Sequence, residues 1–258
     1  MNIRPWRLLL APVLCASLMP VRAAAPDWAA IVGSYPQPGT AQAREEAAIL
    51  LWLQDTRTRA DLARVQAGHP DLDLFLAAAG ASWGASSYPG TKALLKQARE
   101  DMKPVVAGLK ASFARPRPHV TDPALDPALP DDGSFSFPSK HATEGTLFAS
   151  LLAQVDPYDR VAMTEEGRLI GDDRAMAGAH WPSDVMAGQK LGKAFATYWL
   201  GLAENAGLCQ DAAAEWNGAK SGGRRGYLSM GTRSSAGGMS ELTWASAGSL
   251  VRCRLSSR

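Results

Sequence analysis

The sequence predicts an all-α protein, folded as a single compact domain of many helices. Segments with helical spacing of apolar residues follow one another along most of the chain, and most of them begin at a residue type that caps helices. Signals for strands are almost absent, because only residues 134–137 alternate between polar and apolar side chains, and this run is too short to found a sheet. A chain of 258 residues is long enough for one domain with a full core, or at most for two small domains.

The N-terminus has the order of features that is typical of a signal peptide. A basic start precedes the apolar stretch Leu8–Val21, and small residues follow it. Cleavage after Ala23 is favoured, because cleavage after Ala25 would leave Pro26 as the new N-terminus. We therefore expect a signal peptide over residues 1–23 and a periplasmic location for the rest of the chain, with a buried N-terminal helix as the alternative. No later segment approaches the ~20 uninterrupted apolar residues that a membrane span needs, so no span is expected.

Four predicted helices share a start at a threonine or aspartate, whose side chain can accept a hydrogen bond from the free N–H groups of the first turn. Thr58 is followed three residues later by Asp61, which is the pattern of a capping box. Gly68 and Pro70 then end this helix. The four helices cover Thr40–Leu53, Thr58–Ala67, Asp71–Ala79 and Thr91–Met102.

Prolines divide the rest of the predicted domain. Pro104 predicts the start of another helix, which runs to about Ala114. Six prolines between residues 113 and 138 then exclude a helix and predict a long loop, which in a compact domain is usually functional or disordered. The helices expected beyond this loop cover Lys140–Val155, Tyr158–Met176 and Pro182–Ala206.

The segment after Trp216 differs in composition from the chain before it. It is rich in Ser, Gly and Arg and has no sustained periodicity, so we expect an all-helical domain over residues 24–216 and a flexible tail over 217–258. Cys209 and Cys253 remain after the expected cleavage. A disulfide and two separate thiols both stay open, because sequence spacing cannot show whether the two residues come close.

Composition excludes two classes of partner or site. The chain is 46% hydrophobic and 20% charged, with a formal net charge of +2. This balance predicts neither binding of nucleic acid nor an acidic tail. The two cysteines do not lie in a cluster of metal ligands, so a cysteine metal site is not expected.

Three short clusters carry the chemistry that we predict for this chain. Each cluster alone has an ordinary structural explanation: a lysine on a helix is usually solvated, Pro-Ser before a helix is an N-cap, and His and Asp four residues apart often form a capping pair. Nine residue identities in a fixed order, each expected at roughly one in twenty, are harder to attribute to chance. The other two histidines, His69 and His119, are expected in loops. The clusters are Lys110 with Arg117-Pro118, then Pro138-Ser139-Lys140-His141, then Arg174 with His180 and Asp184.

These clusters resemble the signature of the superfamily that unites type-2 phosphatidic acid phosphatases with vanadium haloperoxidases. The resemblance covers roughly residues 30–205. Within the superfamily, the chain is most similar to the bacterial class A non-specific acid phosphatases, which are exported, soluble and all-helical. The resemblance implies an exported acid phosphatase that hydrolyses small-molecule phosphate monoesters through a phosphohistidine intermediate. It implies neither a cofactor nor a metal ion.

The resemblance assigns catalytic roles to three residues. His180 is expected to take the phosphoryl group onto a ring nitrogen, and Asp184 to hold the other nitrogen, which fixes the tautomer and stabilises charge on the ring. His141 is expected to protonate the departing alcohol and then to act as base on the water that hydrolyses the phosphohistidine. An unperturbed pKa of about 6.5 suits histidine to both tasks.

The resemblance also assigns a phosphate-binding cradle. Phosphoryl transfer spreads negative charge over three oxygens, so arginine forks, a lysine charge and helix N-termini can stabilise it without a metal ion. Two helix starts are expected at this site, at Ser139 and Pro182. The expected phosphate-binding residues are Lys110, Arg117, Ser139, Lys140 and Arg174.

Two residues depart from the pattern of the family. Lys140 stands where the family usually has glycine, and its side chain could crowd the backbone N–H groups near the phosphate or add positive charge. Asp173 stands where the family usually has serine, and its carboxylate could brace Arg174 or repel phosphate. Arg115 has the wrong spacing for the motif and is expected to add a positive charge at the mouth of the site.

Three alternative functions stay open. A vanadium haloperoxidase uses the same cradle, because vanadate mimics phosphate, although the compact length and the likeness to class A phosphatases favour hydrolysis. A lipid phosphate phosphatase is the second alternative, although those relatives are normally built from membrane-spanning helices. The third is an inactive protein that binds phosphate-like anions, which the departures at Lys140 and Asp173 keep open. The physiological substrate and the oligomeric state do not follow from the sequence.

Overall fold

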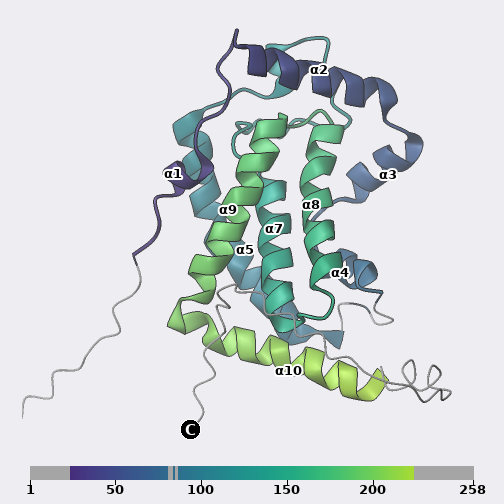
Figure 1. Cartoon of the computed structure of the whole chain (residues 1–258), viewed down its shortest axis with the longest axis vertical. Helices are drawn as coiled ribbons and strands as arrows, with labels where there is room; N and C mark the ends of the chain where they lie inside the picture. The colour runs from purple at the N-terminus through teal and green to yellow at the C-terminus, as the bar shows by residue number, and fades with distance from the viewer. Residues whose placement is uncertain (1–23, 81–83, 85–86, 224–258) are drawn as a thin grey trace, which may run out of the picture.

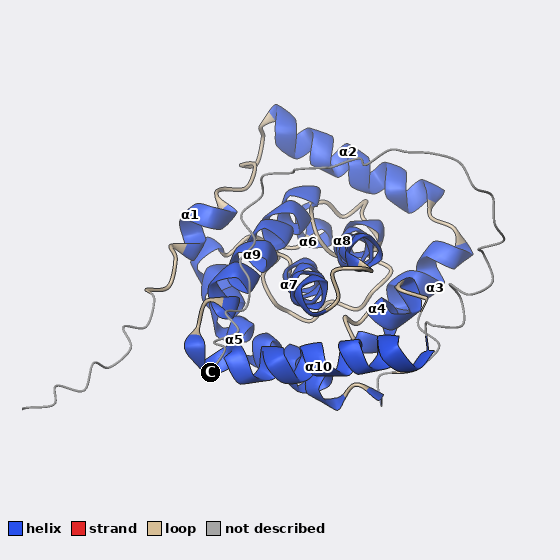
Figure 2. Cartoon of the chain, turned by 60° about the horizontal axis from the view of Figure 1, so that its bottom comes forward, coloured by secondary structure: helices blue, strands red, loops and turns tan. Residues whose placement is uncertain are grey.

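The computed structural model describes residues 24–80, 84 and 87–223, and within these ranges every regular element is a helix. Figure 1 shows α7 (Lys140–Val155) in the middle of the bundle, with α8 (Arg160–Met176) and α9 (Pro182–Leu200) packed along it. Figure 2 views α7 nearly end-on, with the other helices arranged around it. The predicted all-α fold class is confirmed for the described part of the chain.

α7 occupies the centre because its side chains are apolar on nearly every side. Leu147, Phe148, Leu151 and Leu152 are each at most 1% exposed, as expected for a helix that is hydrophobic all round. The surrounding elements are α1 (Trp28–Val32), α2 (Ala41–Thr56), α3 (Arg59–Ala67), α4 (Leu72–Ala78), α5 (Pro89–Phe113), α6 (Pro118–Thr121), a 3₁₀ turn (Ala203–Asn205) and α10 (Ala206–Gly223).

Capping side chains begin four helices where the sequence predicts them. The side-chain oxygens of Thr40, Thr58, Asp71 and Ser139 each accept a hydrogen bond from the backbone N–H three residues later, at 3.0–3.4 Å. Asp61 completes the predicted capping box, because its Oδ2 accepts the N–H of Thr58 at 2.7 Å. The predicted starts of α2, α3, α4 and α7 are thereby confirmed.

The predicted break at Pro104 is wrong, since α5 is one continuous helix. Buried apolar residues continue at helical spacing on both sides of the proline, while Pro104 itself lies on the exposed face. Burial of one long apolar stripe outweighs the single backbone hydrogen bond that a proline removes. The stripe consists of Leu94, Leu95, Ala98, Met102, Val106 and Leu109.

The C-terminal half also differs from the prediction. The predicted helix Pro182–Ala206 ends at Leu200, and α10 then continues past residue 217, where the predicted tail begins. Cys209 is buried within α10. The rest of the tail, Cys253 and residues 1–23 lie outside the described residues, so the flexible tail, the disulfide and the signal peptide stay predictions.

α10 is held against the start of α5 by a carboxylate. Glu215 Oε2 accepts the backbone N–H of Thr91 at 2.9 Å and its hydroxyl at 2.8 Å. Thr91 is therefore not the N-cap that the sequence predicts, and α5 begins two residues earlier at Pro89. Trp216 adds a hydrogen bond from its ring nitrogen to Thr91 Oγ1 at 3.1 Å.

The long loop after α5 is confirmed except for one helical turn. α6 lies inside the predicted loop, and a proline at its first position is compatible with a helix start. His119 belongs to this turn and not to a loop, and its Nε2 lies 3.3 Å from a carboxylate oxygen of Asp131. The remainder of residues 114–139 is irregular and carries much of the site described below.

Glycines allow α7 to lie against its neighbours at very short range. A Cβ atom at Gly192 of α9 would lie 2.3 Å from the carbonyl oxygen of Thr143 in α7. A Cβ atom at Gly167 of α8 would lie 2.6 Å from the carbonyl oxygen of Gly145. Both distances are far below van der Waals contact, so the backbones must separate to admit a side chain.

Replacing Gly192 with alanine is expected to lower the free energy of unfolding by about 1–3 kcal/mol, because the added methyl group overpacks the contact between α7 and α9. The matched control is Gly108→Ala in α5, where a Cβ atom meets nothing within 4 Å. Removing a glycine from an exposed helix interior is expected to raise the free energy of unfolding by about 0.5–1 kcal/mol. Urea titrations followed by circular dichroism measure both free energies of unfolding. A change of the same sign in the two variants would contradict the close approach of α9 to α7 at Gly192.

Candidate active site

The predicted site residues come together at one end of the bundle. Lys110 lies in the last turn of α5, His141 in the first turn of α7, Arg174 in the last turn of α8, and Asp184 in the first turn of α9. The end of α8 and the start of α9 lie at the top of Figure 1. The loop between α5 and α7 brings further polar groups to these helix ends.

His180 is buried, and its two ring nitrogens face groups of opposite kind. Nδ1 lies 3.6 Å from Asp184 Oδ2. The hydroxyl of Ser136 lies beside both atoms, 3.4 Å from Nδ1, and donates to Oδ2 at 2.5 Å. Nε2 lies 3.0 Å from NH1 of Arg117, which can only donate. The tautomer that satisfies both sides carries its proton on Nδ1, and its Nε2 lone pair accepts from Arg117 until a substrate displaces that contact.

The ionisation of the two residues agrees with this arrangement. Burial, together with the charges of Arg117 and Lys110, lowers the pKa of His180 to about 4, although Asp184 acts in the opposite sense. Burial alone would raise the pKa of Asp184, but its contacts with His180 and Arg115 bring it below the usual value. A neutral imidazole beside a carboxylate is the form in which a ring nitrogen can act as nucleophile.

Arg117 holds the most contacts in the site. NH1 donates to the carbonyl oxygen of Ala179 at 2.9 Å, in addition to facing His180. NH2 donates to Asp132 Oδ1 at 2.7 Å and to Ser134 Oγ at 2.8 Å, and Nε donates to the Ser134 carbonyl oxygen at 2.9 Å. The guanidinium is therefore fixed in one plane beside the ring nitrogen. All five of its N–H donors have partners within the protein, so a bound anion must replace at least one of them to accept a hydrogen bond from Arg117.

Lys110 brings a second positive charge to the same point. Its Nζ donates to Ser134 Oγ at 3.4 Å and to the carbonyl oxygen of Phe135. Burial, together with the charge of Arg117, lowers the pKa of Lys110 to about 8. The ammonium group is thus charged at neutral pH and loses its charge in mildly alkaline solution.

Arg174 is anchored from the opposite side by the end of α3. Its NH2 donates to the carbonyl oxygens of Val65 at 3.2 Å and Gly68 at 2.7 Å. Its Nε is buried and has no hydrogen-bond partner among the described residues. A buried donor without a partner is costly, so this nitrogen is suited to an anion that enters the site.

The start of α7 adds a helix N-terminus and a second histidine, His141, to the site. Ser139 Oγ caps the helix, and its own N–H donates to the carbonyl oxygen of Asp184 at 3.0 Å. Burial, with the charge of Arg174 as the next cause, lowers the pKa of His141 to about 3. His69, which lies in the predicted loop after α3, packs against His141 with ring centroids 5.6 Å apart.

The two departures from the family pattern have different surroundings. Lys140 is exposed, so its side chain points away from the backbone of the site and its charge contributes to lowering the pKa of His141. Asp173 binds Arg64 of α3 at 3.0 Å, and its negative charge also acts on the neighbouring Arg174, whose pKa it raises against the effect of burial. This ion pair attaches α3 to α8, and the end of α3 in turn anchors Arg174.

Arg115 does not lie at the mouth of the site, which corrects the prediction. It is 5% exposed and donates to Asp184 Oδ1 at 2.6 Å and to Glu46 Oε2 at 2.8 Å. The prediction had placed its charge at the mouth of the site because the spacing of Arg115 from Lys110 does not fit the motif. Glu46, Ser134 and Ser136 also contribute to the site and were missed. The only sequence signal for the two serines is the polar alternation at residues 134–137.

The described residues contain neither a cluster of metal ligands nor a membrane-spanning helix. No group of three or more His, Cys, Asp or Glu side chains in this part of the chain is arranged to hold a metal ion. Among the described helices, none combines the length and the apolar character needed to cross a membrane.

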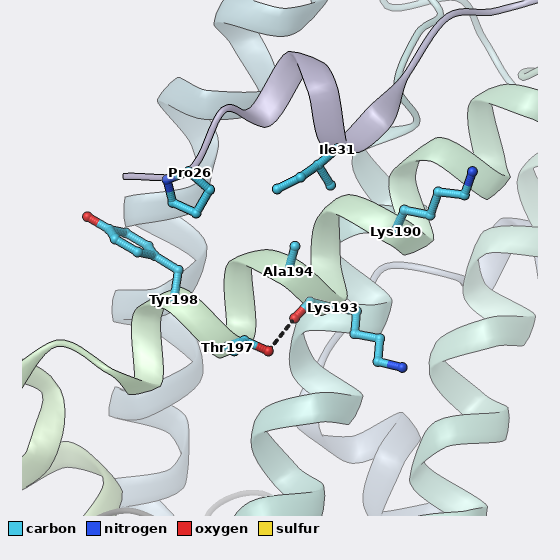
Figure 3. Close-up of a pocket in the computed structure, with 7 residues that line it drawn as sticks. All are labelled: Pro26, Ile31, Lys190, Lys193, Ala194, Thr197 and Tyr198. Carbon is cyan, nitrogen blue, oxygen red and sulfur yellow. Dashed lines mark hydrogen bonds between the residues drawn. The ribbon is translucent and has the colours of Figure 1, made fainter. Parts of the chain in front are cut away.

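A separate groove lies along the middle of α9. Its volume is about 620 Å³. Figure 3 shows the groove between α9 and the N-terminal segment that carries Pro26 and Ile31 of α1. Ala194 and Tyr198 line its floor, and Lys190 lies at its edge. None of the predicted site residues lines this groove.

Comparison with known families places the site within one matched region. Residues 103–207 match the family model of the PAP2 superfamily. This region contains every predicted catalytic and phosphate-binding residue, from Lys110 to Asp184. It does not contain Glu46, Arg64 or His69, which contact the site from the N-terminal part of the chain.

Several curated proteins are similar to parts of the chain. An acid phosphatase of Zymomonas mobilis subsp. mobilis is 32% identical over 130 residues, which cover 46% of this chain and 49% of that protein. A non-specific acid phosphatase of Salmonella typhi is 36% identical over 92 residues, or 33% of this chain and 36% of that protein. A lipid A 1-phosphatase of Rhizobium johnstonii is 38% identical over 91 residues, or 34% of this chain and 37% of that protein. The chain thus spans about half or less of the length of each of these relatives.

Proposed function

We propose that the protein is an acid phosphatase of the PAP2 superfamily, whose family model matches residues 103–207 and with them the three sequence clusters. It hydrolyses phosphate monoesters through a phosphohistidine on His180, without a metal ion. The observation that carries the proposal is the buried imidazole of His180, whose Nε2 faces the Arg117 guanidinium while Nδ1 faces Asp184 and Ser136.

Phosphoryl transfer to His180 is the first step. The phosphate group binds among Lys110, Arg117 and Arg174, and the start of α7 supplies the hydroxyl of Ser139. The Nε2 lone pair attacks phosphorus, so that an N–P bond forms as the ester P–O bond breaks. The substrate monoanion brings the proton that His141 relays to the departing oxygen, and the negative charge of Asp184 stabilises the ring as it becomes cationic.

Hydrolysis of the phosphohistidine is the second step. His141, now neutral, takes a proton from a water molecule, and the oxygen of that water attacks phosphorus. The N–P bond breaks, and its electron pair returns to Nε2 of His180. His141 then returns its proton to the inorganic phosphate as it leaves, and both imidazoles are again neutral, so the site is ready for another substrate.

The pKa values of the two histidines give the expected pH range. A phosphate monoester loses its second proton at about pH 6, so below that pH the monoanion brings the proton that neutral His141 lacks. Below about pH 4 the ring of His180 is itself protonated and cannot attack. We expect hydrolysis to be fastest between about pH 4 and 6 and to decline on both sides.

Binding of inorganic phosphate is expected to weaken as the pH rises above about 8, because Lys110 then loses its positive charge. Isothermal titration calorimetry between pH 7.5 and 9.5 measures the Kd. In Lys110→Arg, whose guanidinium stays charged throughout this range, the loss of affinity should be absent. The same pH dependence in both proteins would show that another group controls binding.

The class of ester and the location are also parts of the proposal. Small-molecule phosphate monoesters are the proposed substrates, supported by the similarity to two acid phosphatases. A lipid-linked phosphate monoester is the second candidate, and the similarity to a lipid A 1-phosphatase favours it. A periplasmic location follows from the signal peptide expected over residues 1–23.

The first test is hydrolysis of p-nitrophenyl phosphate by the purified protein from pH 4 to 9, with EDTA present. The proposal expects chelator-resistant activity with an acid optimum and inhibition by vanadate. Dispersed phosphatidic acid is assayed in parallel, and a much larger kcat/KM for the lipid would replace the first substrate class with the second. Absence of hydrolysis of both esters at every pH would overturn the proposal.

A further inference from the structure

A buried row of charges continues behind Asp184, away from the phosphate site. Arg115 lies between two carboxylates that come from different helices, Asp184 of α9 and Glu46 of α2. All three residues are at most 5% exposed, and the N···O distances are 2.6 and 2.8 Å. Charges are buried in this way only when they are paired, because the loss of hydration is otherwise too costly.

Aromatic rings and backbone contacts fix Arg115 and Glu46 in place. The guanidinium carbon lies 4.7 Å from the ring centre of Tyr35 and 5.1 Å from that of Trp181. The second carboxylate oxygen of Glu46 accepts the backbone N–H of Ser183 at 2.6 Å, in the first turn of α9. The row is therefore attached at both ends to the helix start that carries Asp184.

Arg115 decides which oxygen of Asp184 faces His180. Oδ1 of Asp184 accepts from Arg115, so Oδ2 is left for the N–H of Trp181 at 2.9 Å, for Ser136 and for the ring. Rotation of the carboxylate would break several of these contacts together. A fixed Oδ2 in turn keeps the ring proton of His180 on Nδ1.

The charge balance of the row also suits a ring that becomes cationic. Glu46, Arg115 and Asp184 together carry one net negative charge when all are ionised. This negative charge lies behind a neutral imidazole in the resting site. When His180 gains positive charge during phosphoryl transfer, that charge balances the net negative charge of the row. The carboxylate of Asp184 already lies beside the ring, so it need not move to stabilise the charge.

We propose that Arg115 and Glu46 are positioning residues for His180: Arg115 fixes the carboxylate of Asp184, and Glu46 fixes Arg115. The two residues together hold the ring in the tautomer that presents Nε2. This inference rests on the proposed function only for its effect on rate, since the tautomer of His180 can be observed without any turnover.

The test compares Glu46→Gln, Arg115→Lys and Arg115→Met with the unchanged protein. Side-chain ¹⁵N resonances of histidine, observed near pH 6.5, distinguish a protonated from an unprotonated ring nitrogen. The unchanged protein is expected to show His180 protonated on Nδ1, and the three variants to show a mixture of tautomers. The turnover number for p-nitrophenyl phosphate is expected to fall by about 10- to 100-fold, with a smaller change in KM.

The matched control is Glu215→Gln, which neutralises a carboxylate that accepts backbone hydrogen bonds at the other end of α5. It is expected to lower the Tm without altering the His180 tautomer or kcat. If Arg115→Met does not fold, Glu46→Gln and Arg115→Lys decide the question. Variants that lower the Tm as the control does, with the His180 resonances unchanged, would overturn the inference. If the unchanged protein hydrolyses no ester, the proposed function fails, and the resonances still test the positioning role.

Discussion

Replacing His180 with alanine is expected to lower kcat for p-nitrophenyl phosphate by about 10⁴-fold or more, because the nucleophile itself is removed. Lys110, Arg117 and Arg174 remain, and their contacts do not include His180 except at NH1 of Arg117. Binding of vanadate should therefore persist within about tenfold. Steady-state kinetics near pH 5 and vanadate titration measure the two effects.

The matched control for this variant is His119→Ala. His119 lies in α6, where its Nε2 is 3.3 Å from Asp131 Oδ2, and it has no place in the proposed mechanism. Its removal is expected to leave kcat close to that of the unchanged protein. Full activity in His180→Ala, or equal losses in the two variants, would show that another group is the nucleophile.

Replacing Arg117 with alanine is expected to lower kcat/KM by about 10³-fold, because the guanidinium lies beside the attacking nitrogen and meets charge that develops in the transition state. Arg117→Lys restores a positive charge but not the planar fork, so it should recover only part of the loss. Kinetics with p-nitrophenyl phosphate, together with Tm values, separate this effect from a loss of folding.

Arg168→Ala serves as the control for Arg117→Ala. Arg168 is half exposed on α8 and pairs with Glu165 and Asp172 on the same helix. Surface pairs of this kind contribute little to stability, so the change should leave both kcat/KM and Tm nearly unaltered. An Arg117→Ala protein that retains wild-type kcat/KM would contradict the position assigned to this guanidinium.

Helix starts could be predicted because the signals for them are local. Thr58 and Asp61 lie three residues apart, and their reciprocal hydrogen bonds follow from that spacing alone. The continuity of α5 through Pro104 could not be predicted in the same way. Burial of a long apolar stripe against the rest of the bundle decides it, and that partner surface is not visible in the local sequence.

The proximity of the proposed catalytic residues could be predicted from the sequence, whereas the contacts of the residues that hold them could not. His180 and Asp184 are four apart at a helix start, so their proximity is a consequence of helical geometry. Ser136 reaches Asp184 across 48 residues, and Glu46 reaches Arg115 across 69. Such contacts depend on how helices pack, and no spacing rule indicates them.

The surroundings of the charged residues beside the motifs also depend on helix packing and could not be predicted from local spacing. Asp173 and Arg115 were interpreted by their neighbours in the sequence, as a brace or repulsive group and as a charge at the mouth. Their partners in the fold are Arg64 and the carboxylates of Glu46 and Asp184. A buried charge is placed by its counter-charge, which here comes from α3, α2 or α9.

The most direct test of the central claim is to trap the covalent intermediate on His180. The protein is mixed near pH 5 with an aryl phosphate labelled in its phosphoryl group, quenched in alkali within milliseconds, and mapped by mass spectrometry. The account predicts a label that is stable in alkali and lost in acid, located on His180 and absent from His180→Ala. Continued turnover with no such label, or a label on another residue, would contradict it.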